Sequence, residues 1–344
     1  MKSFLILLFC ISLNAAHAQD FHFSGNEQLP MYLNPAMTGF TKDTPGRAMV
    51  KYRNQWSSIL GRDAFQTYAA SVEGRICQQN FWGFGGFVMR DKSGQPSFQT
   101  TQGLISVSYH QKVGSKQYLA GGVNFGRIQY EIDNRLAFGE QFDGNVGFDF
   151  NLPSFETIDQ LEANLIDIGL GLLLYSAKGQ RQQKDKYNWF LGVALQHLNT
   201  ATNYQFKQNN STDALNLRLR KTLHGGIALN TTQSRQIAFK ANLQWQEPHW
   251  QSVFGFYFQL SAVNFGLAAR LARNQPNSVF PPVMDAGILS FSYTHNEQLK
   301  IGLSYDLNVS PLYRSTNYRG AMEFTASYFF GDSSNCIKDY YKKS

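Results

Sequence analysis

The feature that most constrains the fold is an alternation between apolar and small or polar side chains that recurs along the chain. From Leu299 to Leu307 every second residue is apolar, and the residues between them are small or polar. The segments 189–196, 237–245 and 265–272 follow the same rule. A period of two is typical of strands whose two faces meet different surroundings. The sequence therefore predicts an all-β fold.

A soluble sandwich also alternates, so the kind of side chain must decide between a sandwich and a barrel. The polar faces carry many Gly, Ala and Ser residues, which suit a crowded barrel interior, and aromatic residues, 15% of the chain, gather near strand ends. Past the amino terminus, the longest apolar run, Ile168–Tyr175, is much shorter than the ~20 residues that a spanning helix needs. The mean hydropathy of −0.33 still fits a barrel, because only alternate residues face lipid. These features predict a transmembrane antiparallel outer-membrane β-barrel.

The connections between the expected strands separate into short and long ones. Short turns are expected near residues 78–81, 111–117, 233–236, 261–264 and 295–298. Longer segments are expected near residues 134–161, 198–220, 273–282 and 308–319. Because short periplasmic turns and long outer loops are typical of outer-membrane barrels, this pattern predicts about 14 strands within residues 47–330.

The amino terminus has the features of a secretory signal peptide. Lys2 supplies a positive charge, Phe4–Leu13 form an apolar stretch, and Ala16-His17-Ala18 matches a cleavage site that follows small residues. We expect residues 1–18 to be removed by cleavage after Ala18, with export to the outer membrane. Residues 19–46 would then form a periplasmic amino-terminal segment, and residues 331–344 a periplasmic tail.

Two cysteines remain after the expected cleavage, Cys77 and Cys336. Cys77 falls at the first short turn and Cys336 follows the last strand. Because the last strand of a barrel closes against the first, the two sulfur atoms could lie close enough for a disulfide, which an oxidising periplasm permits. Two unpaired thiols are equally compatible with the sequence.

Several function classes are disfavoured by the distribution of charged and catalytic residue types. The formal net charge is +7, but Lys and Arg are dispersed, so we expect a basic rim near anionic lipid and no nucleic-acid binding. The histidines at 197, 224, 249 and 295 lie on separate segments without metal-ligand spacing, and no Gly-x-Ser-x-Gly element is present. The sequence therefore predicts no enzyme activity, no metal and no cofactor.

Charged residues on inward strand faces predict a network at the barrel closure. Lys51 and Arg53 alternate with apolar neighbours and should point into the lumen, while Asp306 and Glu323 occupy the inward faces of the last two strands. Charges in a lumen are costly unless they are paired, so these four residues are expected to pair across the closure. The network could block the pore or hold an inserted peptide. We prefer the simpler interpretation that it satisfies the barrel interior.

The segment Asn34-Pro35-Ala36 precedes the first expected strand. Pro35 restricts its own φ and biases Asn34 towards an extended conformation, and Gly39 permits a tight turn. The segment could be a plug in the periplasmic mouth or a rigid lead-in to the first strand. We prefer the lead-in.

A series of motifs begins with residues 30–39 (PMYLNPAMTG), followed by Tyr52–Trp56 (YRNQW) and Phe65–Tyr68 (FQTY). It continues with residues 91–94, 136–141 and 301–306, and with Ser310, Leu312 and Glu323. Together these residues resemble the PorP/SprF family of type IX secretion system membrane proteins from Bacteroidetes. The chain departs from the family pattern at Glu140, where Asp is commoner, and at Cys336-Ile337, which replaces Cys-Pro. The resemblance covers nearly the whole mature chain.

The resemblance implies a noncatalytic role in protein export. Members of the family are outer-membrane barrels that support secretion or surface attachment of proteins bearing type IX C-terminal sorting domains. Some are linked to gliding adhesins, and one branch connects to the periplasmic ring of the secretion machine. The implied partners of this chain are therefore an exported protein, components of the periplasmic secretion ring, and outer-membrane lipid.

Three function hypotheses follow from these observations. In the leading one, the long outer loops bind an exported protein through the aromatic residues Phe138, Phe142, Tyr204 and Phe206, since aromatic anchors dominate interface energetics. These aromatics could instead pack the loops on the barrel rim. The second is an outer-membrane channel for small or hydrophobic solutes, which is disfavoured because the interior is expected to be rich in Gly, Ala and aromatic residues rather than charge. The third is an outer-membrane lipase or protease.

Overall fold

The computed structural model describes most of the chain between residues 21 and 331. The described residues are 21–24, 29–41, 44–61, 64–76, 80–94, 98–132, 142–143, 147–148, 152, 162–176, 186–199, 204–208, 211–215, 217–231, 234–247, 249–273, 283–310 and 313–331. For residues 58, 132, 142–143, 147–148, 204–208 and 211–215, only the backbone is described.

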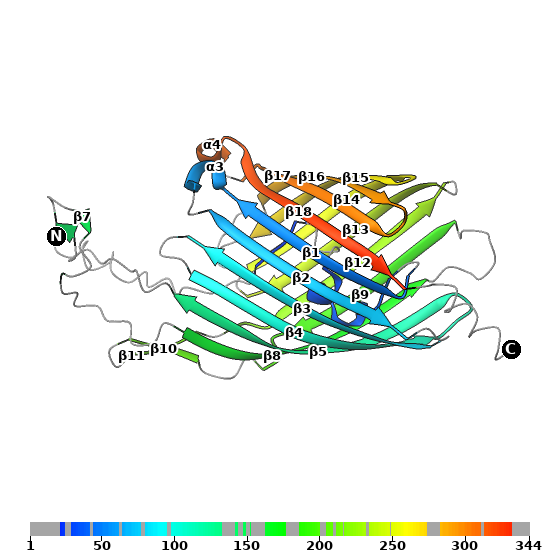
Figure 1. Ribbon diagram of the computed structural model, residues 1–344, viewed down its shortest axis with the longest axis horizontal. Coiled ribbons are helices and arrows are strands. Elements are labelled where there is room, and N and C mark those ends of the chain that lie inside the picture. The colour runs from blue at the N-terminus through cyan, green and yellow to red at the C-terminus, as the bar shows by residue number, and fades with distance from the viewer. Residues whose placement is uncertain are drawn as a thin grey trace, which may run out of the picture.

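Fourteen antiparallel strands form one closed barrel (Figure 1). The strands are β1 (Gly46–Gln55), β2 (Phe65–Arg75), β3 (Phe81–Ser93), β4 (Phe98–Lys112), β5 (Gln117–Ile132), β8 (Glu162–Ser176), β9 (Tyr187–Gln196), β12 (Arg220–Asn230), β13 (Arg235–Gln246), β14 (His249–Leu260), β15 (Val263–Arg273), β16 (Val283–His295), β17 (Leu299–Asn308) and β18 (Arg319–Phe330). Each of these fourteen strands pairs with the next of the fourteen along the chain, so that β5 pairs with β8 and β9 with β12. The last strand, β18, pairs with β1 and closes the barrel. The predicted barrel, its strand number and the closure of its last strand on its first are confirmed.

The two faces of the strands follow the alternation of the sequence. Along β17, Leu303 is half exposed on the outer surface, whereas Ser304 and Asp306 are buried in the lumen. Along β9, Leu191 and Val193 face outward in the same way. The outer surface is therefore an apolar belt, as a hydrocarbon environment requires.

No helix within the described ranges is both long enough and apolar enough to cross a membrane.

The connections divide the barrel into two ends. What we call the long-loop end carries the connections 56–64, 133–161, 197–219, 274–282 and 309–318. The short-turn end carries 76–80, 113–116, 231–234, 261–262 and 296–298. The expected division holds with exceptions, because 94–97 and 247–248 lie at the long-loop end and 177–186 at the short-turn end.

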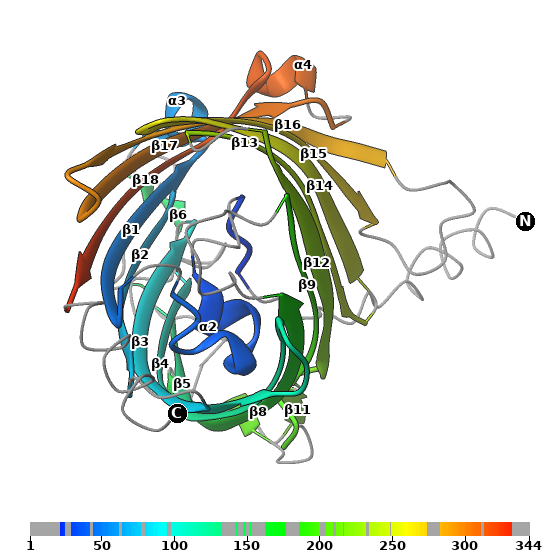
Figure 2. The same cartoon turned by 90° about the vertical axis from the view of Figure 1, so that its right-hand side faces the viewer.

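Short helices and small hairpins belong to the connections at the long-loop end. The short helices α3 (Ser57–Leu60) and α4 (Tyr313–Thr316) lie near one another at its rim, next to β1 and β18 (Figures 1 and 2). Two further hairpins belong to the long connections, β6 (Phe142–Asp143) with β7 (Gly147–Phe148) and β10 (Tyr204–Gln208) with β11 (Ser211–Leu215). Neither hairpin is part of the barrel wall.

Residues 21–24 and 29–41, which we call the plug, lie inside the barrel. The helix α2 (Pro30–Leu33) and the single 3-10 turn η3 (Pro35–Met37) sit in the lumen on the side of β3, β4, β5 and β8 (Figure 2). Here the structure departs from the preferred interpretation of Asn34-Pro35-Ala36 as a rigid lead-in to the first strand. A barrel of this size encloses more space than its own side chains fill, and this apolar segment fills part of it.

The apolar belt generates a prediction about the outer face of β17. Replacing Leu303 with Arg should lower the free energy of unfolding by about 2–4 kcal/mol, whereas Leu299→Arg at the strand end should cost only about 0–1 kcal/mol. Urea-induced unfolding of the protein folded into lipid vesicles measures both. Equal losses at the two positions would contradict a membrane-embedded β17.

Candidate functional site: the plugged lumen

The side chain of Asn34 is one of the points at which the plug is fixed to the barrel wall. Its Nδ2 donates to the carbonyl oxygens of Leu172 (3.0 Å) and Val193 (3.2 Å) and lies 2.9 Å from His224 Nε2. Its Oδ1 accepts from the backbone N–H of Ala36 at 2.9 Å and so caps η3. Asn34 is fully buried and has the extended backbone that Pro35 imposes. One side chain therefore links β8, β9 and β12 to the plug.

Glycines on the inner face of the wall make room for the plug. A Cβ at Gly122 of β5 would overlap the backbone of Pro35 and Ala36, and one at Gly171 of β8 would overlap the amide oxygen of Asn34. A Cβ at Gly83 of β3 would meet the carbonyl of Thr38. The small inward residues that indicated a crowded interior in the sequence therefore have a specific use here. They form the seat of the plug.

Polar contacts continue along the plug to Thr38 and Gly39. The hydroxyl of Thr38 lies 2.6 Å from that of Ser106, and the Thr38 carbonyl accepts from Ser108 Oγ at 2.6 Å. The N–H of Gly39, which has a φ of 72°, donates to Glu73 Oε2 at 2.8 Å. These bonds fix the plug to β2 and β4 where the chain turns towards β1.

Tyr32 attaches the plug to β9 and β12. Its carbonyl accepts from Gln196 Nε2 at 2.6 Å and from Arg220 Nη2 at 3.0 Å. The guanidinium of Arg220 also lies 4.3 Å from the centre of the Tyr32 ring, and its Nε donates to Gln196 Oε1. The Arg220 cation is thus buried with a ring face and two oxygens as partners, which offsets the cost of its desolvation.

Apolar side chains of the plug complete its packing. They form two buried clusters with the wall, one with Phe23, Leu29, Met31, Tyr32, Met49, Ala69, Phe87, Met89 and Leu104, the other with Leu33, Ala36, Met37, Ala120, Leu173 and Tyr175. Burial of such side chains contributes about 1.5–3 kcal/mol each. The plug is therefore held by apolar packing as well as by hydrogen bonds.

The structure brings the four charged residues predicted at the closure together. Lys51 Nζ lies 2.8 Å from Glu323 Oε2, and Arg53 Nη1 lies 2.6 Å from Glu323 Oε1. Arg53 Nη2 is 3.5 Å from Asp306 Oδ2. All four side chains are almost completely buried. We call these four residues, together with Arg270 and Asp285, the closure cluster.

Two members of the closure cluster escaped the sequence reasoning. Arg270 of β15 places Nη1 2.9 Å from Asp306 Oδ2, and its Nε lies 2.6 Å from Asp285 Oδ2 of β16. Arg270 follows Gly266 and Ala268 on the inward face of β15, so the sequence alone could have placed this charged side chain in the lumen. With Arg270 and Asp285, the cluster contains three cations and three carboxylates.

Ser24 joins the amino-terminal segment to the closure cluster. Its backbone N–H donates to Glu323 Oε1 at 2.7 Å, and its hydroxyl donates to Asp306 Oδ2 at 2.7 Å and accepts from Arg53 Nη1 at 2.6 Å. Beside it, Phe23 lies under Lys51 Nζ, 4.6 Å from the ring centre. No motif in the sequence marked Ser24, because its carboxylate partners Asp306 and Glu323 lie almost the whole chain away.

The lumen is more polar than the sequence indicated. The expected interior of Gly, Ala and aromatic residues is present around the plug, but many charged and hydrogen-bonding side chains are buried as well, including Glu73, Asp91, His110, Asp167, Arg220 and Arg270. His197 Nδ1, for example, lies 2.8 Å from Asp167 Oδ1, and Gln102 donates to the other oxygen of that carboxylate. The expectation was wrong because a wide barrel can place polar side chains against a polar insert.

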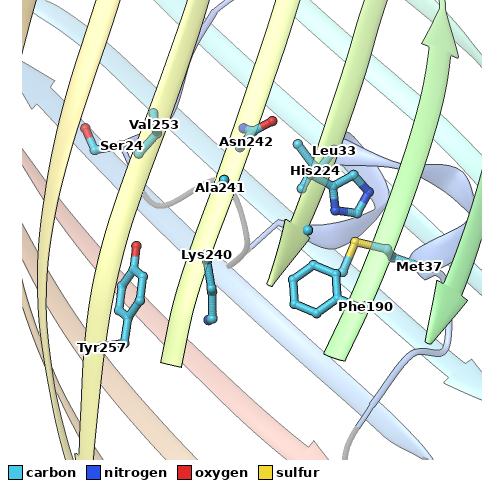
Figure 3. A pocket seen from close by; sticks show the side chains of 11 residues that line it. Ser24, Leu33, Met37, Phe190, His224, Lys240, Ala241, Asn242, Val253 and Tyr257 are labelled. Carbon is cyan, nitrogen blue, oxygen red and sulfur yellow. The ribbon is translucent and has the colours of Figure 1, made fainter. Parts of the chain in front are cut away.

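Cavities remain in the lumen beside the plug. One, of about 720 Å³, opens toward the long-loop end and is lined by Phe21, Tyr32, Arg53, Asp91 and Arg270 among others. A second, of about 180 Å³, lies at the short-turn end and includes Lys240, Tyr257 and Lys300 in its lining. A small cavity of about 30 Å³ between them is lined by Ser24, His224 and Asn242 (Figure 3). No group of three or more potential metal ligands occurs among the residues that the structure describes.

Several predicted site residues cannot be placed. Phe138, Cys77, Cys336 and the expected signal peptide lie outside the described residues. Phe142, Tyr204 and Phe206 belong to the hairpins of the long connections, where only the backbone is described. Their roles stay predictions.

The comparison with known families agrees with the resemblance seen in the sequence. The family model of the type IX secretion system membrane protein PorP/SprF matches residues 15–328. The chain belongs to this family. Among the residues that carried the resemblance, Asn34 binds the plug to the wall, and Arg53, Asp306 and Glu323 belong to the closure cluster. Part of the PorP/SprF pattern in this chain therefore lies in the closed lumen.

Solved structures with a related barrel are similar to this PorP/SprF protein only at low identity. The CymD monoaromatic hydrocarbon channel is 13% identical with a TM-score of 0.49, over 89% of this chain and 94% of that one. A FadL homologue from Pseudomonas aeruginosa is 11% identical with a TM-score of 0.48, over 86% and 93% of the two chains. No curated protein shows significant sequence similarity to this chain.

The glycine seat gives a prediction with a neighbouring control. Gly122→Ala should displace the plug, because the new methyl group overlaps the Pro35–Ala36 backbone, whereas Gly121→Ala on the outer face of β5 meets only ordinary contact distances. Hydrogen exchange of residues 29–41 should rise in the first variant and stay unchanged in the second. Equal exchange in the two variants would show that the plug does not rest on Gly122.

The closure cluster gives a second prediction. Glu323→Gln leaves Lys51 and Arg53 buried without their shared carboxylate, so the free energy of unfolding should fall by about 3–5 kcal/mol. The double variant Lys51→Met/Glu323→Gln removes one uncompensated cation and should recover part of the loss. Thermal unfolding followed by gel mobility measures all three proteins. The assignment of a coupled cluster fails when the double variant is less stable than Glu323→Gln alone.

Proposed function

We propose that this PorP/SprF barrel is a noncatalytic component of the type IX secretion system that binds an exported protein at its long-loop end and helps to secrete it or anchor it at the cell surface. The partner in this proposal carries a type IX C-terminal sorting domain. The barrel lies in the outer membrane with its long-loop end outside and its short-turn end in the periplasm, where it contacts components of the secretion ring.

The observation that carries the proposal is the closed lumen. A plug fixed to several wall strands, together with Ser24 bound on the closure cluster, occupies the space through which a transported chain or solute would pass. A barrel closed in this way offers its ends, not its interior, to other molecules. The loops at the long-loop end are the largest surfaces available for recognition, and loops on a rigid scaffold commonly carry binding residues.

The aromatic residues of those loops are the proposed contacts. Tyr204 and Phe206 belong to a hairpin, β10–β11, that lies outside the barrel wall, and Phe142 belongs to the smaller hairpin β6–β7. Phe138 is close to β6 in sequence. A paired backbone presents such side chains with less loss of conformational entropy on binding than an unpaired loop would.

The proposal is tested by purifying the tagged barrel from outer membranes and identifying the proteins that elute with it. An exported protein ending in a sorting domain should elute with the unmodified barrel, and Tyr204→Ala/Phe206→Ala should reduce its yield. The matched control is Tyr187→Ala, which changes an exposed aromatic residue at the opposite end of the barrel. Elution of the barrel alone, or equal yields from the loop variant and the control, would contradict the proposed role.

Conductance measurements distinguish the proposed binding role from the alternative role as a channel. The unmodified protein in a planar lipid bilayer should show no stable open state, because the plug and Ser24 close the lumen. A large and persistent conductance from the unmodified protein would favour the channel for small or hydrophobic solutes instead.

A further inference from the structure

The cavity of about 720 Å³ at the long-loop end has two unlike sides. On the side of β14 to β18, its lining is mainly polar and includes Arg270 and Asp306. The plug residues Phe21 and Tyr32 also border it. On the side of β1 to β5, the lining contributes four aromatic residues, Trp56, Phe65, Phe98 and Tyr130. A pocket of this size that combines an aromatic surface with a few polar groups has the character of a ligand site.

One negative charge in this lining remains when the charged groups are paired. The closure cluster, part of which borders the cavity, contains three cations and three carboxylates and is balanced. Asp91 of β3 is a further carboxylate of the lining, and it is 8% exposed. Among the described residues, no Lys, Arg or His forms an ion pair with Asp91, and the interactions of His22, which also borders the cavity, are with other groups. Arg53, two strands away, is already bound to Glu323 and Asp306.

Two hydroxyl groups hold the carboxylate of Asp91 in place. Its Oδ1 accepts from Thr67 Oγ1 at 2.6 Å, and its Oδ2 accepts from Ser93 Oγ at 2.9 Å. Donation to both oxygens favours the charged form of the carboxylate. Neither hydroxyl carries a positive charge, and a buried carboxylate without a cation is costly. The lining of the cavity therefore presents a fixed negative charge that a cationic ligand would compensate.

Asp91 lies close to the mouth of the cavity. On the inward face of β3, only Ser93 lies between Asp91 and the end of the strand. Since successive inward residues are about 7 Å apart, a side chain as long as that of lysine or arginine can reach the carboxylate from the mouth.

Aromatic rings are placed to receive such a side chain. Phe98 is paired in register with Ser93, and its ring stacks on that of Tyr130 with the centres 5.6 Å apart. The rings of Trp56 and Phe65 meet edge to face at 5.3 Å. Ring faces attract a cation, and their apolar surface packs against the methylene groups that carry it. Charge and aromatic surface therefore favour the same kind of ligand.

We propose that this cavity is a receptor site for a lysine or arginine side chain of the exported protein. Asp91 is the ion-pair partner of the ammonium or guanidinium group, and the aromatic residues are its packing surface. A metal ion fits less well, because calcium takes six or more oxygen ligands and the described residues gather no group of three potential metal ligands. The inference rests on the proposed function, because the exported protein supplies the side chain.

The test compares three pentapeptides, Gly-Ser-X-Ser-Gly, in which X is arginine, lysine or citrulline. Citrulline has the shape of arginine but carries no charge. Saturation-transfer NMR titrations with the full protein in lipid nanodiscs give the dissociation constants. The arginine and lysine peptides should bind at least about tenfold more tightly than the citrulline peptide, because hydrogen bonds between charged groups are stronger. Equal affinities for the three peptides overturn the proposal, and this comparison requires no variant to fold.

Three variants locate the site. Asp91→Asn keeps the shape of the side chain and removes its charge, so both basic peptides should bind about as weakly as the citrulline peptide. Phe98→Leu should weaken their binding about two- to fivefold through the loss of a ring face. Glu162→Gln is the matched control, because it removes a carboxylate from the exposed outer face of β8 at the same end, and it should leave all affinities unchanged. Selective binding that survives Asp91→Asn overturns the assignment to this cavity.

Failure of the cavity and failure of the proposed function give different results. In the co-elution experiment, Asp91→Asn should lower the yield of the exported protein, and Glu162→Gln should not. Equal yields from the two variants overturn the side-chain receptor and leave binding at the loops intact. An absence of any eluting exported protein, together with charge-selective peptide binding, overturns the proposed partner and supports the cation site of the cavity.

Discussion

The structure depends on one constraint, which is that a fourteen-strand barrel encloses more volume than its own wall can fill. The chain meets this constraint by placing residues that precede the first strand inside the lumen. Apolar side chains of the plug then find apolar wall residues, and its polar backbone finds Asn, Thr, Gln and Arg side chains. The polar interior is stable because nearly every buried charge at the closure has a partner.

The wall of the barrel could be predicted from the sequence, because the determinants of a strand are local. A period of two decides which residues face lipid, and the same period placed Lys51, Arg53, Asp306 and Glu323 in the lumen before their partners were known. Antiparallel order and an even strand number then place β18 beside β1. Each of these inferences needs only neighbouring residues and the geometry of a closed sheet.

The interior could not be predicted in the same way. Asn34 meets residues of β8, β9 and β12, and no periodicity in residues 21–41 indicates those contacts. Asp285 escaped notice for a more specific reason. It lies at an irregularity of the β15–β16 register, next to Arg270, where the strict alternation of faces is interrupted. The glycines of the seat were visible as small residues, but their purpose becomes clear only with the plug in place.

The attachment of Ser24 has a consequence for biogenesis. Its bonds reach Asp306 and Glu323, which belong to the last two strands, whereas Ser24 itself precedes the first strand. The amino-terminal segment therefore has no complete docking site until the final hairpin has inserted. A truncated chain that lacks the last two strands would leave this segment without its bonds to Asp306 and Glu323.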